Sequence, residues 1–342
     1  MIFTDQFDFY LPEELIAQRP IFPRDQCRLM VINRKNQTIE HRIFTDLGQY
    51  VNRGDLLVVN DSRVIPARFY TQKYPTGGKV ELLFLHHHQE LWACLLSHSR
   101  RIREGTILSL QGHPEIFWKV IKKEPDWWHL KPSFPPEREK EIFSQYGTTP
   151  TPPYIKTPRV NLEEYQTVYA RYDGSVAAPT AGLHFTQPFI EELKRNGVGF
   201  ESLTLHVGPG TFFPVKSPIV EDHHMHSEWY ELDQKTAEKI QSTKRNDKRV
   251  IAVGTTVVRV LESIYQAQKK IVEHQGETDI FIYPGFQFQI IDALITNFHI
   301  PRSTLFMLVC AFAGTDLMKY AYEEAIKHRY RFYSFGDATL IE

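Results

Sequence analysis

The sequence predicts an α/β main domain that contains an inserted small β-barrel domain. From about residue 160 onward, strand-like segments that end in glycine alternate with helical segments, as in an α/β sheet. Between residues 64 and 150 the strand-like segments are short and closely spaced, which is typical of a small sheet or barrel. The opening residues also have α/β character. We therefore expect a discontinuous main domain, residues 1–63 and 151–342, interrupted by the barrel at residues 64–150.

Four elements are expected in the opening segment. A helix is predicted at residues 11–18, because Pro12 and the two glutamates that follow it favour a helix start. Residues 27–34 and 54–61 are apolar and predict buried strands. Residues 41–51 have apolar side chains at helical spacing and predict a second helix.

Within the barrel segment, the turn Gly77-Gly78 precedes a predicted strand, and the segment ends in prolines. Its strands are expected at residues 79–85, 91–98, 105–110 and 115–123. Pro135 and Pro136 then lead into a helical stretch. Prolines break helices and favour extended backbone, so the proline-rich residues 148–158 mark the junction with the main domain.

The second half alternates strands and helices. A helix at residues 189–197 is closed by Gly197. A second helix, residues 255–266, follows a strand directly, and an apolar helix follows the polar residues after Ile295. Strands are expected at residues 203–208, 248–254 and 279–285.

Composition limits the possible classes of protein. Hydrophobic residues make up 42% of the 342 residues and charged residues 24%, so a disordered or fibrous chain is excluded. The net charge of -1 means that an RNA partner must be held by a local basic patch. Arginines and lysines recur between residues 19 and 103, either as a phosphate-binding surface or as scattered solvated charges.

Three cysteines, Cys27, Cys94 and Cys310, lie far apart, which argues against disulfides and a cysteine zinc site. The first residues lack the basic start and apolar run of a signal peptide. The apolar stretch 305–313 is too short to span a bilayer, which needs about 20 residues. We expect a cytoplasmic protein without a membrane partner.

Two segments carry small residues beside a strand or helix. Residues 175–186, SVAAPTAGLHFT, would let a ligand approach the backbone closely, and Thr186 can cap the helix that follows. Residues 205–215, LHVGPGTFFPV, follow a strand, where open α/β sheets place ligands. The alternatives are a tight loop that only turns the chain and, for His206, a structural histidine.

Three further segments carry polar groups. Residues 222–232 concentrate three histidines and Glu228, which suggests acid–base chemistry; a metal site is disfavoured, because the HExxH spacing is absent. Residues 251–263 predict a glycine turn and a helix start that would bind an anion. Arg259 and Glu262 lie on the first turns of that helix, where a surface salt bridge is the alternative to a functional role. Residues 295–314 predict a polar loop before an apolar helix, where Ser303 is a candidate N-cap.

These segments together resemble the S-adenosylmethionine:tRNA ribosyltransferase-isomerase family of queuosine biosynthesis. The resemblance extends through nearly the whole chain in order, except for residues 86–147, to which we assign no site residue. Its motifs are QFDFYLPEELIAQRP (6–20), GDLLVVNDSRVIPAR (54–68), TGGKVELL (76–83), YQTVYA (165–170), GSVAAPTAGLHFT (174–186), HVGPGTFFPV (206–215), HHMHSE (223–228), AVGTT (252–256), DIFIYPGF (279–286), TNFHIPRSTL (296–305) and YRFYSFGDATLI (330–341).

The resemblance implies an α/β domain with a small barrel and a reaction at the wobble position of tRNA. The ribosyl part of S-adenosylmethionine would be transferred to the aminomethyl group of 7-aminomethyl-7-deazaguanine, giving epoxyqueuosine and releasing adenine and methionine. It implies no metal and no permanently bound cofactor, because S-adenosylmethionine is a co-substrate. We expect a monomer.

The site residues are chosen by their chemistry within these loops. Acid–base catalysis is expected from His206, His226 and Glu228, with His184 as a further candidate. Co-substrate binding is expected from Gly208, Gly210, Thr211, Gly254, Thr255 and Thr256, mainly through backbone amides. Substrate binding is expected from Asp61, Arg63, Thr180, Asn297 and His299.

Three other functions compete with this interpretation. A non-catalytic RNA-binding protein would bind tRNA without releasing adenine. A metal-dependent hydrolase that uses the histidine cluster would lose activity with a chelator. An ordinary methyltransferase would release S-adenosylhomocysteine.

Overall fold

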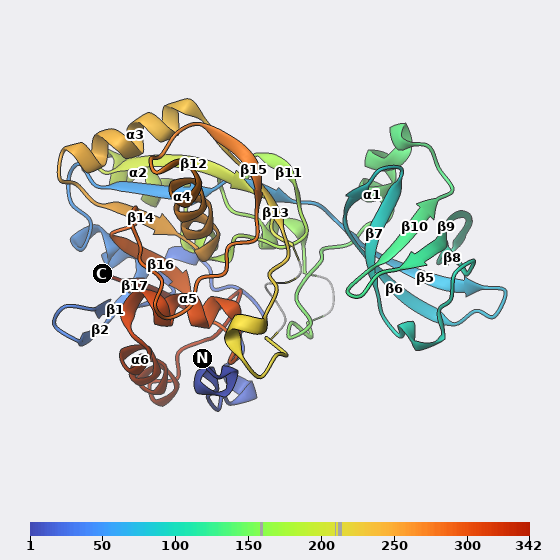
Figure 1. Cartoon of the computed structure of the whole chain (residues 1–342), viewed down its shortest axis with the longest axis horizontal. Coiled ribbons are helices and arrows are strands. Elements are labelled where there is room, and N and C mark those ends of the chain that lie inside the picture. Colours follow the sequence, from blue (N-terminus) through green and yellow to red (C-terminus); the bar gives the residue numbers. More distant parts are fainter. Residues whose placement is uncertain (158–159, 209, 211–213) are drawn as a thin grey trace.

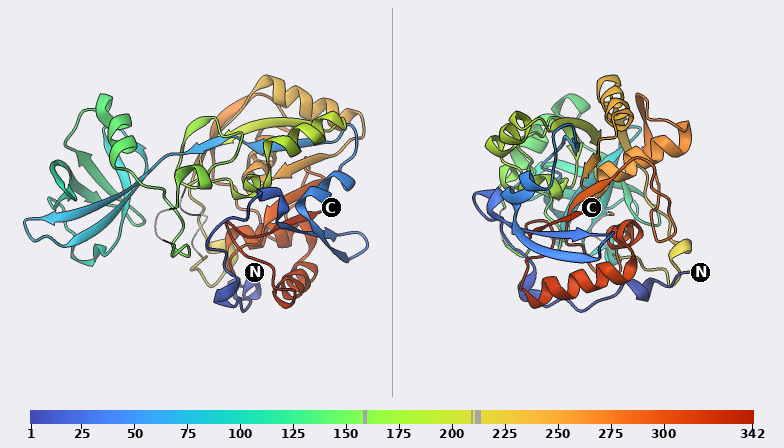
Figure 2. Two further views of the ribbon diagram at one scale, coloured as in Figure 1. Left: turned by 180° about the vertical axis from the view of Figure 1, so that it is seen from behind. Right: turned by 90° about the vertical axis from the view of Figure 1, so that its left-hand side faces the viewer.

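The chain folds into an α/β body with a closed barrel standing to one side (Figure 1). The computed structural model describes residues 1–157, 160–208, 210 and 214–342. Figure 2 shows from behind that only narrow connections link the two parts. The predicted fold class, an α/β domain with an inserted barrel, is therefore confirmed.

The body is built on a nine-stranded sheet of order β15-β13-β12-β3-β14-β16-β17-β1-β2. Strands β12, β3, β14 and β16 are neighbours and run parallel, so their carboxyl ends meet at one edge. The strands are β1 (Arg28–Asn33), β2 (Thr38–Ile43), β3 (Leu56–Asn60), β12 (Gly199–Leu205), β13 (Glu228–Leu232), β14 (Val250–Val253), β15 (His274–Thr278), β16 (Ala293–Asn297) and β17 (Ala338–Ile341).

Both faces of this sheet are buried. Along β3, Leu56 and Val58 face one hydrophobic cluster, whereas Leu57 and Val59 face another. Such continuous apolar strands are typical of parallel sheets covered on both sides. The first cluster packs against α3 (Gln234–Arg245), α4 (Thr255–Gln268), α5 (Thr304–Ala313) and α6 (Thr315–Lys327), and the second against α2 (Gln187–Arg195) and the 3-10 helix Phe44–Gln49.

The barrel is closed by six antiparallel strands in the order β10-β7-β6-β5-β8-β9. Its interior is an aromatic core that includes Phe69, Trp92 and Trp118. The elements are β5 (Arg68–Tyr74), β6 (Lys79–His88), β7 (Leu91–Leu96), β8 (Ile107–Leu110), β9 (His113–Lys123), β10 (Trp128–Pro132) and α1 (Glu139–Tyr146).

The chain crosses between the two parts at one place. On the way out, β4 (Ser62–Val64) pairs in parallel with β11 (Tyr172–Ser175), which lies on the returning chain. Arg68 and Thr148 form an antiparallel bridge beside it. The boundaries at residues 63/64 and 150/151 stay our proposal for the domain limits.

Three predicted elements are wrong. Residues 11–18 contain only the single 3-10 turn Glu13–Leu15, and residues 41–51 divide between the end of β2 and the 3-10 helix Phe44–Gln49. Residues 279–285 form no strand, because the pairing with β13 ends at Thr278. By contrast, the caps are confirmed: the Thr186 and Ser303 side chains accept hydrogen bonds from the amides of Phe189 and Phe306.

The crossing has no room for a side chain at Gly147. A Cβ atom there would lie 1.9 Å from the Pro66 carbonyl oxygen, whereas one at Gly48 would meet only a Leu193 methyl group at 3.9 Å. Gly147→Ala should therefore destabilise the protein by about 1–3 kcal/mol through overpacking, and Gly48→Ala should have little effect. Thermal unfolding followed by tryptophan fluorescence reports mainly on the barrel, which holds Trp92, Trp118, Trp127 and Trp128. Equal melting temperatures of the two variants would contradict this account of the crossing.

Candidate active site

A cleft of about 1780 Å³ lies between the body and the barrel. It opens at the carboxyl edge of the parallel strands, where open α/β sheets bind ligands. The body contributes six of the predicted site residues, namely Arg63, His206, Gly208, Gly210, His226 and Glu228. The barrel side contributes residues that include His86, His87, Asp126, Trp127 and Glu139.

His206 follows β12 and is fixed on three sides. Its Nδ1 lies 2.7 Å from the Ser62 hydroxyl, which in turn lies 2.7 Å from the Ser175 hydroxyl. Its ring stacks on Trp229 with centroids 5.1 Å apart. Burial lowers the pKa of His206, so the neutral imidazole, which can accept a proton, is favoured near neutral pH.

Gly174 explains how the His206 ring fits against the crossing strand β11. Its φ is +152°, and a Cβ atom there would lie 2.6 Å from the ring atoms Cε1 and Nε2 of His206. Only glycine permits both this backbone conformation and this approach. Gly174, the first residue of GSVAAPTAGLHFT, therefore makes the space into which the His206 ring packs.

Glu228 begins β13 and is buried in an ion pair with Arg259 of α4. Its other carboxylate oxygen accepts a hydrogen bond of 2.7 Å from the Gly208 amide. Arg259 also donates to the carbonyl oxygens of Thr278 and Ile280. The carboxylate is thus already engaged on both oxygens, which suits positioning better than proton transfer.

Arg259 and Glu262 do not form the expected surface salt bridge. Both side chains are buried, because α4 packs inside the body. Arg259 pairs with Glu228 instead. Glu262 accepts hydrogen bonds from three successive amides, those of Gln289, Ile290 and Ile291.

His226 lies on the loop before β13 and faces the barrel. Its ring centroid is 5.9 Å from that of Trp127, in the turn between β9 and β10. A Cβ atom at Gly210 would lie 3.1 Å from the His226 ring. His226 and Trp127 therefore bring the two parts of the molecule together across the cleft.

A second, smaller pocket of about 70 Å³ lies beside the cleft and shares Val207 and Leu305 with it. It is lined by the remaining strand-end motifs, and six predicted residues contribute to it. These are Thr180, Gly254, Thr255, Thr256, Asn297 and His299. The sequence motifs therefore divide between two neighbouring hollows rather than lining one.

His184 and Asp61 line neither hollow. The ring of His184 is buried between the Cys27 thiol, 3.2 Å from Nδ1, and the Asn297 amide, 3.0 Å from Nε2. The Asp61 carboxylate accepts hydrogen bonds from the hydroxyls of Ser202 and Thr204, each at 2.7 Å. These contacts give both side chains a structural role, because they join neighbouring segments inside the body.

Two glycine amides that we expected to hold the co-substrate already have acceptors. The Gly208 amide donates to Glu228, and the Gly254 amide donates to the carbonyl oxygen of Ile295. Neither amide is therefore available to donate a hydrogen bond to S-adenosylmethionine in this conformation. Thr211 lies outside the described residues.

The barrel side of the cleft was missed by sequence reasoning, which assigned no role to residues 86–147. The adjacent histidines at the end of β6 and the two tryptophans at the start of β10, Trp127 and Trp128, are the signals that could have indicated it. Of the arginines and lysines noted in the first third of the chain, Arg63 reaches the cleft, where it pairs with Glu163 and Asp173. Lys140 and Lys216 add cations there.

Two expectations about the whole chain can also be compared with the structure. All three cysteines are free thiols, as expected, and the structure places all three in the interior. Among the described residues, no single helix is long and apolar enough to cross a membrane. The helices α5 and α6, which meet at a sharp bend, reach that length and apolar composition only when they are taken together.

Fold and site together define a class: a two-domain α/β protein with an inserted barrel and a cleft that carries acid–base side chains. The queuosine biosynthesis protein family matches residues 4–341, and the chain belongs to this family. The chain is similar to two proteins named S-adenosylmethionine:tRNA ribosyltransferase-isomerase. The one from Thermotoga maritima is 50% identical to it over 99% of each chain, and the one from Carboxydothermus hydrogenoformans is 51% identical over 98% of each.

A crystal structure of the S-adenosylmethionine tRNA ribosyltransferase from Thermotoga maritima is similar to the whole chain. Its TM-score is 0.58 at 39% sequence identity, and the match covers 98% of this chain and 100% of that one. The likeness therefore includes the barrel as well as the α/β body.

The buried histidines predict how stability depends on pH. Burial lowers the pKa values of His184 and His299 to about 3 each, whereas in the unfolded chain such rings protonate near ~6.5. Between these values the unfolded state binds more protons, so stability falls as pH decreases, by up to ~1.4 kcal/mol per pH unit for each ring. Urea unfolding between pH 7 and pH 4 should show a shallower loss for His184→Gln than for wild type. The exposed control His98→Asn should match wild type, and an unchanged slope in His184→Gln would contradict the assignment.

Proposed function

We propose that this protein transfers and isomerises the ribosyl moiety of S-adenosylmethionine onto 7-aminomethyl-7-deazaguanine at the wobble position of tRNA. The product is epoxyqueuosine-tRNA, and adenine and methionine are released. The observation that carries the proposal is the cleft between body and barrel, which is lined by both His206 and His226. We propose further that it acts as a monomer in the cytoplasm, with S-adenosylmethionine as a co-substrate and no permanently bound cofactor.

The reaction requires at least two acid–base groups. The five ribose carbons must close into a cyclopentane ring, which needs a carbanion at the carbon next to sulfur. The sulfonium makes that proton acidic, so a base must remove it, while adenine needs a proton to leave and the attacking amine must be neutral. His206 and His226 supply two such groups.

His206 is the better candidate for the base. Its lowered pKa keeps the ring neutral, and Ser62 and Trp229 hold its orientation. Efficient general bases combine such a fixed position with the correct protonation state at working pH. We assign the second acid–base role to His226 and a positioning role to Glu228, which holds Arg259 and the Gly208 amide.

The two hollows suit different parts of the substrates. The wide cleft is bordered by Lys140 and Lys216, two cations that suit contacts with tRNA phosphates. Arg63 lies there too, but it is paired with Glu163 and Asp173. Trp127 offers an aromatic face on which a base can stack. The small pocket at the start of α4 suits the polar end of S-adenosylmethionine, since first-turn amides have no partner within the helix.

One assay tests the proposed reaction against its competitors. The protein is incubated with S-adenosylmethionine and tRNA that carries 7-aminomethyl-7-deazaguanine, and the small products are identified. We expect adenine and methionine in equal amounts, unaffected by chelator. S-adenosylhomocysteine would instead indicate a methyltransferase, and tRNA binding without products would indicate an RNA-binding protein.

The roles of the side chains are tested by adenine release. His206→Ala and His226→Ala should each lower the rate by about 10²–10⁴-fold, the usual contribution of a general acid or base. Their melting temperatures should stay near that of wild type. Glu228→Gln should lower the rate and the melting temperature together, because breaking a buried ion pair costs about 3–5 kcal/mol. The exposed His98→Asn is the control, and wild-type rates in both histidine variants would exclude the assignment.

A further inference from the structure

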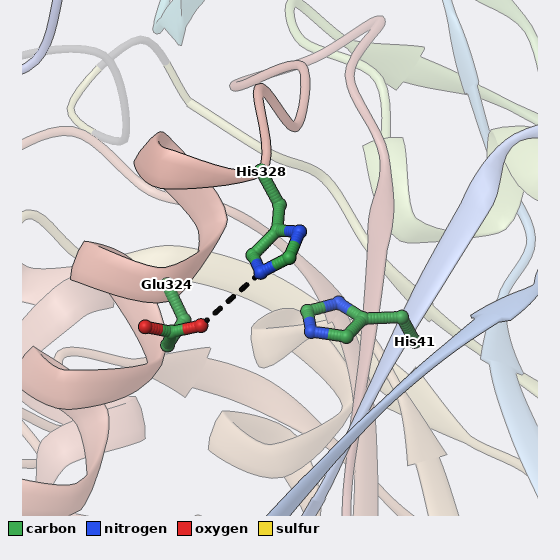
Figure 3. Close-up of side chains that lie close together, drawn as sticks. All are labelled: His41, Glu324 and His328. Atoms are coloured by element: carbon green, nitrogen blue, oxygen red, sulfur yellow. Dashed lines mark ion pairs between the residues drawn. The ribbon is translucent and has the colours of Figure 1, made fainter.

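A cluster of two histidines and a glutamate lies on the α/β body, on the side away from the barrel (Figure 1). His41 belongs to β2, whereas Glu324 and His328 stand at the end of α6. One ligand atom of each side chain lies within 4.8 Å of those of the other two. Figure 3 shows the three side chains converging on one point. None of them lines the catalytic cleft.

The fold brings these groups together at the surface of the body. Residues four apart lie on the same face of a helix, and Glu324 Oε2 is accordingly 3.3 Å from His328 Nε2. The edge strand β2 supplies the third group from the end of the sheet, and the rings of His41 and His328 lie with centroids 4.4 Å apart. The side chains of His41 and His328 are exposed, so a cation could reach them from solvent.

The second ring nitrogen of His41 makes a hydrogen bond that fixes the orientation of its ring. His41 Nδ1 lies 2.9 Å from the Tyr330 hydroxyl, which leaves Nε2 directed at the cluster. Metal-binding histidines usually bond their second ring nitrogen in this manner. Tyr330 is itself fixed, since its ring is buried and the Arg28 guanidinium lies 3.9 Å above it.

We propose that His41, Glu324 and His328 bind one Zn²⁺ or a similar divalent transition metal ion. Two imidazole nitrogens and one carboxylate oxygen form a common zinc ligand set, and water would complete the four-coordinate site. Mg²⁺ and Ca²⁺ prefer oxygen ligands and do not suit it. The bound ion would join the edge strand β2 to helix α6, and so stabilise the fold rather than take part in the reaction.

Zinc titration of the whole protein with a competing chromophoric chelator tests the site. His328→Ala removes one ligand but leaves the contact between His41 and Tyr330 in place. We expect wild type to bind one equivalent of Zn²⁺ more than His328→Ala and to gain a few degrees in melting temperature with zinc that the variant does not gain. Histidines elsewhere that bind zinc do not change this difference, because they are the same in both proteins.

Two further variants make the result specific. Glu324→Gln should weaken zinc binding while both imidazoles remain, and His98→Asn, with an exposed barrel histidine replaced, should bind as wild type does. Melting temperatures measured without metal show whether each variant is folded. The same stoichiometry and the same zinc-induced shift in wild type, His328→Ala and Glu324→Gln would overturn the proposal.

Discussion

The buried ion pair between Glu228 and Arg259 holds the candidate active site together. Taking two charges out of water is costly, and the cost is recovered only when further hydrogen bonds satisfy both groups. Here the Gly208 amide donates a hydrogen bond to the Glu228 carboxylate, and the Arg259 guanidinium donates to the carbonyl oxygens of Thr278 and Ile280. Four segments far apart in sequence are thereby fixed relative to each other.

The position of that pair follows from the direction of the strands. Because β12, β3, β14 and β16 run parallel, the residues that follow them emerge at one edge. His206 and Gly254 directly follow β12 and β14, and Asn297 is the last residue of β16, which is why their motifs become neighbours. The ion pair then joins this edge to β13 and α4, so the loop that carries His226 starts from a fixed point.

Much of this arrangement could be predicted from sequence, since periodicity and caps are local. The helix after Gly254 and the apolar helix after Ser303 are both found where expected. Residues 11–18 and 279–285 were mispredicted because tertiary contacts, rather than local preference, decide their backbone. His184 could not be distinguished from a catalytic histidine, since its burial against Cys27 depends on segments 157 residues apart. On the barrel side of the cleft, the adjacent histidines and tryptophans are visible in the sequence, but their position opposite His226 depends on how the barrel packs against the body.

The bridge between Arg68 and Thr148 also bears on how such a protein could arise. The chain leaves the α/β body for the barrel and returns from it at adjacent points. The two ends of the barrel segment can therefore join the body without any lengthening of its loops. Segments with neighbouring ends are the ones that folds accept as insertions. An ancestral α/β protein could therefore have gained the barrel in a single event. That event would have placed the barrel beside the sheet edge, so that residues such as His86, Asp126 and Trp127 now form one wall of the cleft.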